Sequence, residues 1–176
     1  MHLLIPAAGV GRRMGSDRNK LLLPLLGQPI LAWTLQAAAA ASHLEWVGSI
    51  CQPVERPDSE QMIDQCYLQI PIAFIQGGDT RQASVYNGLQ ALPAEATHVL
   101  IHDGARCLAT PELFDRCAQA ALKVPGFVAA VPVKDTIKQV DDQRVVVNTP
   151  ARSHLWAAHT PQGIEVAQLK QCRDKG

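Results

Sequence analysis

The amino-terminal segment places the tightest constraint on what this 176-residue chain can fold into. The apolar run at residues 2–5 is typical of a short buried strand, and a loop of small residues with two glycines follows it at 6–14. Glycine lets backbone N–H groups approach a ligand closely, and Arg12, Arg13 and Lys20 add positive charge. Backbone donors and clustered cations are what a polyphosphate group requires, so we predict a nucleotide triphosphate site here.

Two common phosphate-binding motifs do not fit this segment. A Walker A loop ends in Gly-Lys followed by Ser or Thr, whereas Lys20 lies between Asn19 and Leu21. A dinucleotide-binding fingerprint needs a third small residue where Met14 stands. It also needs an acidic residue about 20 positions later, where residues 28–41 hold no carboxylate. A solvated basic surface loop remains the alternative interpretation, because runs of charge are usually solvated.

The composition narrows the possible functions. The formal net charge is zero, so no global field attracts nucleic acid or an anionic membrane, and anion affinity must come from local clusters. The most apolar stretch, residues 30–41, is too short to span a membrane. The five cysteines are scattered and never spaced as Cys-x-x-Cys, and the start lacks the pattern of a signal peptide. We therefore predict a cytoplasmic protein without disulfides or a zinc site.

Strand-like and helix-like segments alternate along most of the chain. Strands are predicted at 46–50, 70–75, 98–101 and 127–133, the last of them buried, and helices at 29–42, 58–67, 81–92 and 110–123. Pro71 marks its strand as an edge strand or as a strand start. This alternation implies βαβ crossovers, a mostly parallel sheet and ligand sites at the carboxyl ends of the strands. The opening loop and two glycine-acid loops, 77–79 and 102–104, all follow predicted strands, so we predict one α/β domain over residues 1–176.

The pattern changes after residue 135. Residues 136–140, a polar turn at 141–143 and residues 144–149 are predicted to form a β-hairpin. A two-stranded hairpin is marginally stable alone in water, so it must pack on something. It either folds back on its own domain or is exchanged with a second subunit as an arm, and the pattern leaves both open. A further strand is predicted within 154–159, and a last helix begins near Glu165.

Together, these segments resemble the 2-C-methyl-D-erythritol 4-phosphate cytidylyltransferases of the non-mevalonate isoprenoid pathway. The resemblance is carried, in family order, by residues 6–14 with Lys20, 77–85, 102–106, 132–138, Arg152 and 160–162. The first motif is common to many sugar-phosphate nucleotidyltransferases, whereas the whole set is specific for the cytidylyl branch. The resemblance implies a Rossmann-like, three-layer α/β fold with a mostly parallel sheet and a protruding β-hairpin arm. It also implies a homodimer in which the arm, here at about 135–152, completes the partner's site.

The resemblance further implies a reaction and the residues that perform it. A cytidylyl group would pass from CTP to 2-C-methyl-D-erythritol 4-phosphate, giving 4-diphosphocytidyl-2-C-methyl-D-erythritol and pyrophosphate, with Mg²⁺ as cofactor. Arg13 and Lys20 would be catalytic, and Asp103 would hold the metal ion. Thr136 and Arg152 would bind the acceptor in the partner's site. The nucleotide would be bound by Ala7, Ala8, Gly9, Gly78, Asp79, Ser84, Asp103 and Arg106.

Two departures from the family pattern keep alternatives open. Leu21 and Leu22 follow Lys20 where the family usually places a polar residue and an aromatic one. The family's carboxyl-terminal portion, with a second metal-binding Asp and another phosphate-facing Lys, is absent from the 176 residues. The alternatives are a pentitol-phosphate cytidylyltransferase, and a nucleotide-binding or dimerisation module without turnover.

Overall fold

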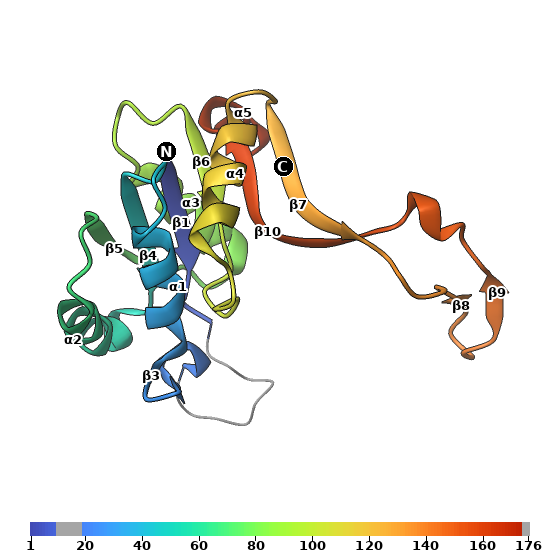
Figure 1. Ribbon diagram of the computed structural model, residues 1–176, viewed down its shortest axis with the longest axis horizontal. Helices are drawn as coiled ribbons and strands as arrows, with labels where there is room; N and C mark the ends of the chain where they lie inside the picture. The colour runs from blue at the N-terminus through green and yellow to red at the C-terminus, as the bar shows by residue number, and fades with distance from the viewer. Residues whose placement is uncertain (10–18, 174–176) are drawn as a thin grey trace.

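The structure is a computed structural model that describes residues 1–9 and 19–173 (Figure 1). A twisted sheet forms its centre, and a long arm extends from one side of it. Arg13, predicted to be catalytic, lies outside the described residues, and its role stays a prediction.

The central sheet has six strands in the order β5-β4-β1-β6-β10-β7. These strands are β1 (His2–Pro6), β4 (Trp46–Cys51), β5 (Ile72–Gln76), β6 (His98–Ile101), β7 (Gly126–Pro132) and β10 (Trp156–Glu165). β1 pairs in parallel with both β4 and β6, and β4 pairs in parallel with β5. Only β10 runs against its neighbours β6 and β7. The predicted mostly parallel sheet is thereby confirmed.

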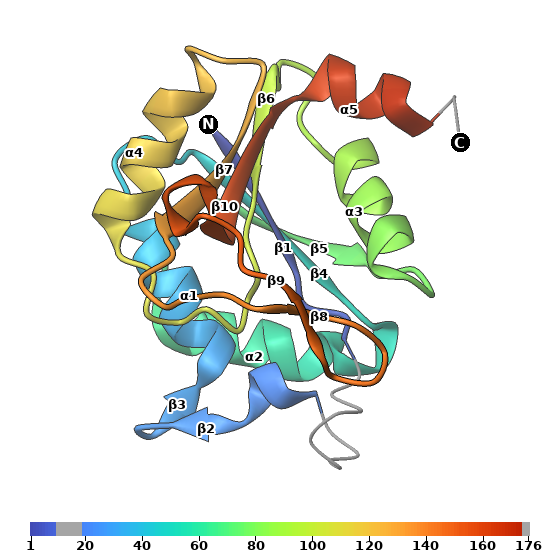
Figure 2. The same cartoon turned by 90° about the vertical axis from the view of Figure 1, so that its right-hand side faces the viewer.

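Helices cover both faces of the sheet and produce three layers (Figure 2). The helices are α1 (Ile30–Ala39), α2 (Arg56–Cys66), α3 (Arg81–Gln90), α4 (Pro111–Ala121) and α5 (Val166–Arg173). Successive side chains of a strand point to opposite faces, so Leu3 and Ile5 pack with α1 and α4, while Leu4 packs with α3. The middle of β1, residues 3–5, is therefore continuously apolar because both faces of the strand are buried. No helix in the described part of the chain is long and apolar enough to cross a membrane.

Short elements connect the strands and helices near the opening loop. The 3₁₀ helices η2 (Lys20–Leu22) and η3 (Pro53–Glu55) follow the segment after β1 and the end of β4. A small hairpin, β2 (Pro24–Leu25) with β3 (Gln28–Pro29), leads into α1 and was not predicted. Its turn places Leu26 and Gly27 at positive φ, where glycine is the favoured residue. The Trp33 indole N–H donates to the Leu25 carbonyl at 2.9 Å and fixes the hairpin on α1.

The two edges of the sheet differ from each other. β5 forms one edge and begins directly after Pro71, as predicted. β7 forms the other edge, and the prediction that it is buried is wrong. Val128 and Val131 are each 51% exposed, whereas Phe127 packs with the core. An edge strand has one neighbour, and here only alternate residues reach the hydrophobic core.

The segment between β7 and β10 leaves the body as the arm, residues 133–155 (Figure 1). Its far part contains β8 (Gln139–Val140) and β9 (Val146–Asn148), which pair antiparallel, and the 3₁₀ helix η4 (Arg152–His154) lies on its return path. Every side chain from 134 to 149 is exposed. The predicted hairpin is confirmed, and it protrudes rather than folding back on its own domain.

Candidate functional site

Three loops meet at one edge of the sheet. They follow β1, β5 and β6, and because these strands run parallel, their carboxyl ends share that edge. The Ala7 N–H donates to the Ile50 carbonyl at 2.7 Å, and the Gly77 N–H donates to the Cys51 carbonyl at 2.9 Å. A Cβ at Gly77 would overlap the Cβ of Ala8, so the two loops touch only because residue 77 is glycine. The predicted nucleotide-binding residues of both loops therefore lie side by side.

The loop after β5 is shaped by the first turn of α3. The buried Ser84 hydroxyl accepts the Gly78 N–H at 3.0 Å and donates to the Gly78 carbonyl at 3.3 Å. Thr80 caps the helix by accepting the Ala83 N–H at 3.0 Å. Asp79, between these anchors, is exposed. The structure thus brings Gly78 and Ser84 together and leaves the Asp79 carboxylate facing outward, where it is available to a ligand.

The loop after β1 is held by a buried amide. The Asn19 side chain, 6% exposed, donates to the Ala7 carbonyl and accepts the Leu21 N–H at 3.0 Å. Lys20, predicted to be catalytic, comes directly after Asn19 and opens η2. Among residues 1–9 and 19–173, no hydrogen bond or ion pair to its ammonium is found. Gly9, the last described residue before the gap, is exposed.

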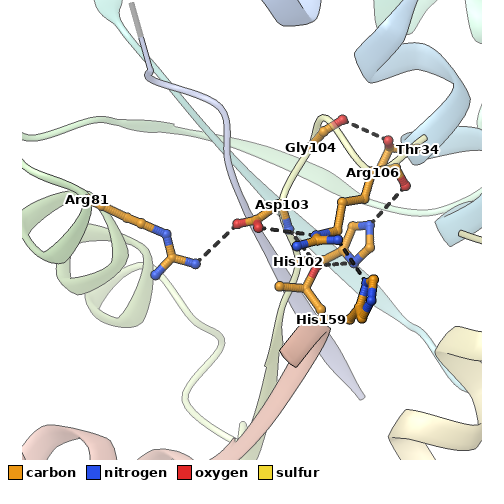
Figure 3. A network of polar contacts seen from close by, with 8 residues as sticks. Thr34, Arg81, His102, Asp103, Gly104, Arg106 and His159 are labelled. Atoms are coloured by element: carbon orange, nitrogen blue, oxygen red, sulfur yellow. Dashed lines mark hydrogen bonds and ion pairs between the residues drawn. The ribbon is translucent and has the colours of Figure 1, made fainter. Parts of the chain in front are cut away.

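Asp103 lies between two arginines after β6 (Figure 3). Its Oδ1 accepts Arg81 Nη2 at 3.2 Å, and its Oδ2 accepts Arg106 Nε at 3.4 Å. Arg106 Nη1 also donates to His159 Nδ1 at 2.9 Å, which ties this loop to β10. All three charged side chains are more than one-third exposed, so these ion pairs are screened and can rearrange when an anion or a cation arrives.

A buried histidine fixes the backbone beneath Asp103. The Thr160 hydroxyl accepts the Asp103 N–H at 3.2 Å, so its own hydrogen is directed to His102 Nδ1 at 3.0 Å. His102 Nε2 then carries the ring proton and donates to the Arg106 carbonyl at 3.4 Å. Burial lowers the pKa of His102 and keeps the ring neutral. These bonds give His102 a structural role and hold Asp103 and Arg106 in place.

The same loop is also packed closely against the core. The Thr34 hydroxyl of α1 donates to the Gly104 carbonyl at 2.9 Å (Figure 3). A Cβ at Gly104 would lie 3.0 Å from Ile5 and 3.1 Å from Leu21. Glycine therefore lets the loop approach both β1 and η2, which brings Asp103 to the same edge as Lys20.

The acidic side chains of this edge can be compared with what Mg²⁺ requires of its ligands. Among the residues that the structure describes, no group of three or more His, Cys, Asp or Glu side chains is arranged to hold a metal ion by itself. Mg²⁺ is commonly bound by one or two carboxylates together with substrate phosphates and water. Asp103, half-exposed at the edge where the predicted phosphate site lies, fits that mode of binding.

The two residues predicted to bind the acceptor lie elsewhere. Thr136 and Arg152 belong to the arm, far from the three loops of their own chain (Figure 1). Thr136 is exposed, and Arg152 Nη1 donates to the Lys134 carbonyl at 2.9 Å. The fold does not bring them into the site of the chain that carries them.

Sequence reasoning missed several residues that touch this site. Arg81 and His159 contact Asp103 and Arg106, and Asn19 holds the loop after β1. A signal existed for Asn19, because asparagine before a short helical turn is a favoured cap. No local signal marked His159, since only the pairing of β10 with β6 brings it near Arg106.

Comparisons with known proteins agree over the full chain. The family model of 2-C-methyl-D-erythritol 4-phosphate cytidylyltransferase (IspD) matches residues 1–176. The enzyme of that name from Synechococcus elongatus is 63% identical over 176 residues, covering 100% of this chain and 76% of the relative. The one from Acaryochloris marina is also 63% identical, covering 100% of this chain and 74% of its own length.

Solved structures show the same fold. The 4-diphosphocytidyl-2C-methyl-D-erythritol synthase from Anaerococcus prevotii superposes with a TM-score of 0.86 at 26% identity, covering 99% of this chain and 74% of that one. The 2-C-methyl-D-erythritol 4-phosphate cytidylyltransferase from Thermus thermophilus gives a TM-score of 0.76 at 29% identity, covering 99% and 74%. The chain therefore belongs to the 2-C-methyl-D-erythritol 4-phosphate cytidylyltransferase family.

Proposed function

We propose that this chain transfers a cytidylyl group from CTP to 2-C-methyl-D-erythritol 4-phosphate in isoprenoid biosynthesis. The products are 4-diphosphocytidyl-2-C-methyl-D-erythritol and pyrophosphate. The observation that carries this proposal is the match to the family along residues 1–176, at 63% identity to its curated members. The meeting of the loops after β1, β5 and β6 at one edge supports it independently.

The reaction requires charge neutralisation more than proton transfer. A phosphate oxygen of the acceptor attacks the α-phosphorus of CTP, a new P–O bond forms, and the bond to the bridging oxygen breaks as pyrophosphate leaves with the electron pair. The nucleophile is already ionised, so it needs no general base. Both reactants are anions, and two unit charges about 4 Å apart interact by roughly 4 kcal/mol at an effective dielectric constant near 20. Positioning and electrostatic stabilisation are therefore the main tasks of the protein.

The residues of this edge suit those tasks. Lys20 and Arg13 would neutralise the triphosphate and the charge that develops in the transition state. Backbone groups of the loops after β1 and β5, at Ala7, Ala8, Gly9 and Gly78, would bind the nucleotide together with Asp79, Ser84 and Arg106. Ser84 would act mainly by shaping Gly78, because its hydroxyl is already bonded there.

Mg²⁺ is the cofactor that this site would use. Asp103 would hold the ion together with the nucleotide phosphates, and the ion would offset the negative charge of the two reactants. Each Asp103 oxygen accepts one arginine, Arg81 on Oδ1 and Arg106 on Oδ2, and has a further lone pair that could be offered to the ion. The remaining steps depend on the chain's own cations and backbone donors.

The arm points to a dimer in which each subunit completes the other's site. The arm carries Thr136 and Arg152 away from the described parts of the three loops of their own chain, and its valines are exposed along the hairpin. A two-stranded hairpin of this kind is marginal alone in water and needs a surface to pack on. We propose that Thr136 and Arg152 bind the acceptor phosphate held by the partner subunit.

The thiols are in keeping with a cytoplasmic location, which we also propose. Cys51, Cys66, Cys107 and Cys117 are free. A reducing compartment maintains cysteines in that state.

A direct assay tests the proposed activity. The purified chain is mixed with CTP, 2-C-methyl-D-erythritol 4-phosphate and Mg²⁺, and release of pyrophosphate is followed together with the mass of the product. UTP and ATP serve as controls for the base, and a pentitol phosphate serves as a control for the acceptor. We expect pyrophosphate only with CTP and the methylerythritol phosphate. Absence of release would refute the proposal, and a faster reaction with the pentitol phosphate would replace it by the alternative acceptor.

A further inference from the structure

We propose that Asn19 is a positioning residue that joins Lys20 to the backbone of residues 7–9, with Gln52 and Glu55 as its supports. Through the carbonyls of Ala7 and Ala8, these side chains would aim two backbone N–H groups at the nucleotide. The inference rests on the proposed use of this loop and of Lys20 in binding CTP.

The hydrogen bonds of Asn19 allow only one orientation of its amide. Oδ1 accepts the Leu21 N–H at 3.0 Å, and Nδ2 donates both to the Ala7 carbonyl and to Glu55 Oε2, the latter at 3.1 Å. A flipped amide would set its oxygen against two acceptors and its NH₂ group against a donor. All three bonds are made by a residue that is almost completely buried, so each lost bond leaves a polar group unpaired.

Two supports come from the other side of the loop. Glu55 Oε2 also accepts the Gln52 N–H at 3.2 Å, and Gln52 Nε2 donates to the Ala8 carbonyl at 3.4 Å. Both residues lie at η3, directly after β4. The carbonyls of Ala7 and Ala8 are thus bound by the side chains of Asn19 and Gln52, which lie at the starts of η2 and η3. The Glu55 carboxylate connects these two residues, because it accepts hydrogen bonds from both.

Holding a carbonyl also aims the next N–H group. In a trans peptide the C=O of one residue and the N–H of the next point in opposite directions. Fixing the Ala7 and Ala8 carbonyls toward Asn19 and Gln52 therefore directs the N–H groups of Ala8 and Gly9 away from them. Neither N–H has a backbone acceptor within the described residues, so both remain available to a phosphate oxygen or to an acceptor atom of a base.

Asn19→Asp tests the inference with little change of shape. The variant keeps an acceptor for the Leu21 N–H but loses both donors, and its carboxylate would lie against the Ala7 carbonyl and the Glu55 carboxylate. We expect kcat to fall by about 10- to 100-fold, as for misplaced catalytic groups, and KM for CTP to rise, while KM for the acceptor stays unchanged. A purely structural role would lower the melting temperature without separating the two KM values.

A second substitution restores a hydrogen bond between positions 19 and 55. In Asn19→Asp combined with Glu55→Gln, the new amide can donate to the new carboxylate, so we expect part of kcat to return. Asn19→Ser covers the case in which Asn19→Asp does not fold. It keeps a capping oxygen for the Leu21 N–H and adds no charge, but its single, shorter O–H donor cannot replace both N–H donors of the Asn19 amide. The same separation of the KM values is expected for it.

Gln28→Glu is the matched control. Gln28 of β3 and Gln36 of α1 form a partly buried pair of amide hydrogen bonds at 3.0 and 3.2 Å. The control therefore makes the same change from amide to carboxylate, and we expect kcat and both KM values of the parent protein. Parent-like kinetics in Asn19→Asp or Asn19→Ser, or equal changes in both KM values, would overturn the inference. An inactive parent protein would instead refute the proposed function itself.

Discussion

The body of the molecule and its arm differ in what holds each of them together. In the body, Leu3, Leu4 and Ile5 of β1 are completely buried between helices on both faces of the sheet. In the arm, every side chain from 134 to 149 is exposed, and the hairpin is joined mainly by backbone hydrogen bonds such as Asp141 N–H to the Val145 carbonyl at 3.0 Å. The body therefore contains its own source of stability, and the arm does not.

The exposure of the arm supports the proposed dimer. Valines 145, 146 and 147 are 57%, 53% and 58% exposed in succession. Contiguous exposed apolar side chains on a soluble domain usually mark an interaction surface. The exposed valines therefore support the proposal that the arm belongs to an interface with a second subunit.

The largest expected difference between the body and the arm is in the unfolding free energy lost when a side chain is truncated. Phe114 is fully buried and its ring meets His102 edge-on at 5.0 Å, so Phe114→Ala should cost about 3–5 kcal/mol of unfolding free energy. Val146→Ala in the arm should change it by less than about 0.5 kcal/mol in a dilute monomer. Urea titrations followed by circular dichroism measure both values. Similar losses for the two variants would show that the arm shares the stability of the body.

Removing the Lys20 ammonium should separate chemistry from folding. Lys20→Ala is expected to lower kcat by about 10²–10³-fold, because it removes a preorganised charge, and to leave the melting temperature unchanged. Lys123→Ala, at an exposed position after α4, is the matched control and should keep full activity. Turnover of Lys20→Ala at the control's rate would refute the catalytic role of Lys20.

An arm variant should lose activity without losing stability of the body. Arg152→Ala is expected to lower turnover at least about tenfold, because it removes a charge-assisted contact to a phosphate. Its thermal unfolding should match that of the parent protein, since Arg152 is exposed and lies in the arm, outside the hydrophobic core.

Mixing two impaired variants tests whether the arm serves the partner. When Lys20→Ala and Arg152→Ala subunits are combined in equal amounts, about half of the dimers are hybrids, and each hybrid contains one intact site. Activity should therefore recover to about a quarter of the parent value. If the arm served its own subunit, every site would lack one residue and no activity would return.

The smallest expected effect concerns His2 and the pH dependence of stability. Burial, with the nearby terminal amine, lowers the pKa of His2 below its ordinary value of 6.5, so the folded body prefers the neutral ring. Below pH 6.5 the unfolded chain binds more protons than the folded one, and stability falls as the pH falls. His2→Gln should reduce this loss in melting scans. An unchanged pH dependence in His2→Gln would contradict the assignment.

The parts of the fold that local patterns determine were predictable from the sequence. The strands at 46–50 and 98–101 and the helices between them follow from apolar periodicity and turn residues, and they appear as β4, β6 and their neighbours. The meeting of the loops after β1, β5 and β6 followed from the parallel arrangement of the strands. The protruding arm was predicted as a hairpin, because alternating apolar residues around a polar turn are a local signal.

Features that depend on long-range pairing were not predictable in the same way. Only the first half of β10 was recognised, and nothing local indicated that it would enter the sheet between β6 and β7 in the opposite direction. That pairing places His159 beside Arg106 and Thr160 beside Asp103. The contacts of Asn19 with Glu55 span 36 positions of sequence and were likewise invisible to pattern analysis.

The course of β10 links the two regions that differ so strongly. It begins at Trp156, where the arm returns, continues through His159 and Thr160 beneath the Asp103 loop, and ends at Glu165 beside β6. The carboxyl end of β10 thus pairs with β6 in the central sheet, and its amino end continues directly from the arm. In the proposed dimer, a shift of the arm would reach the loop of Asp103 and Arg106 through Thr160 and His159 of this strand, so subunit assembly and the geometry of the proposed phosphate site would be coupled.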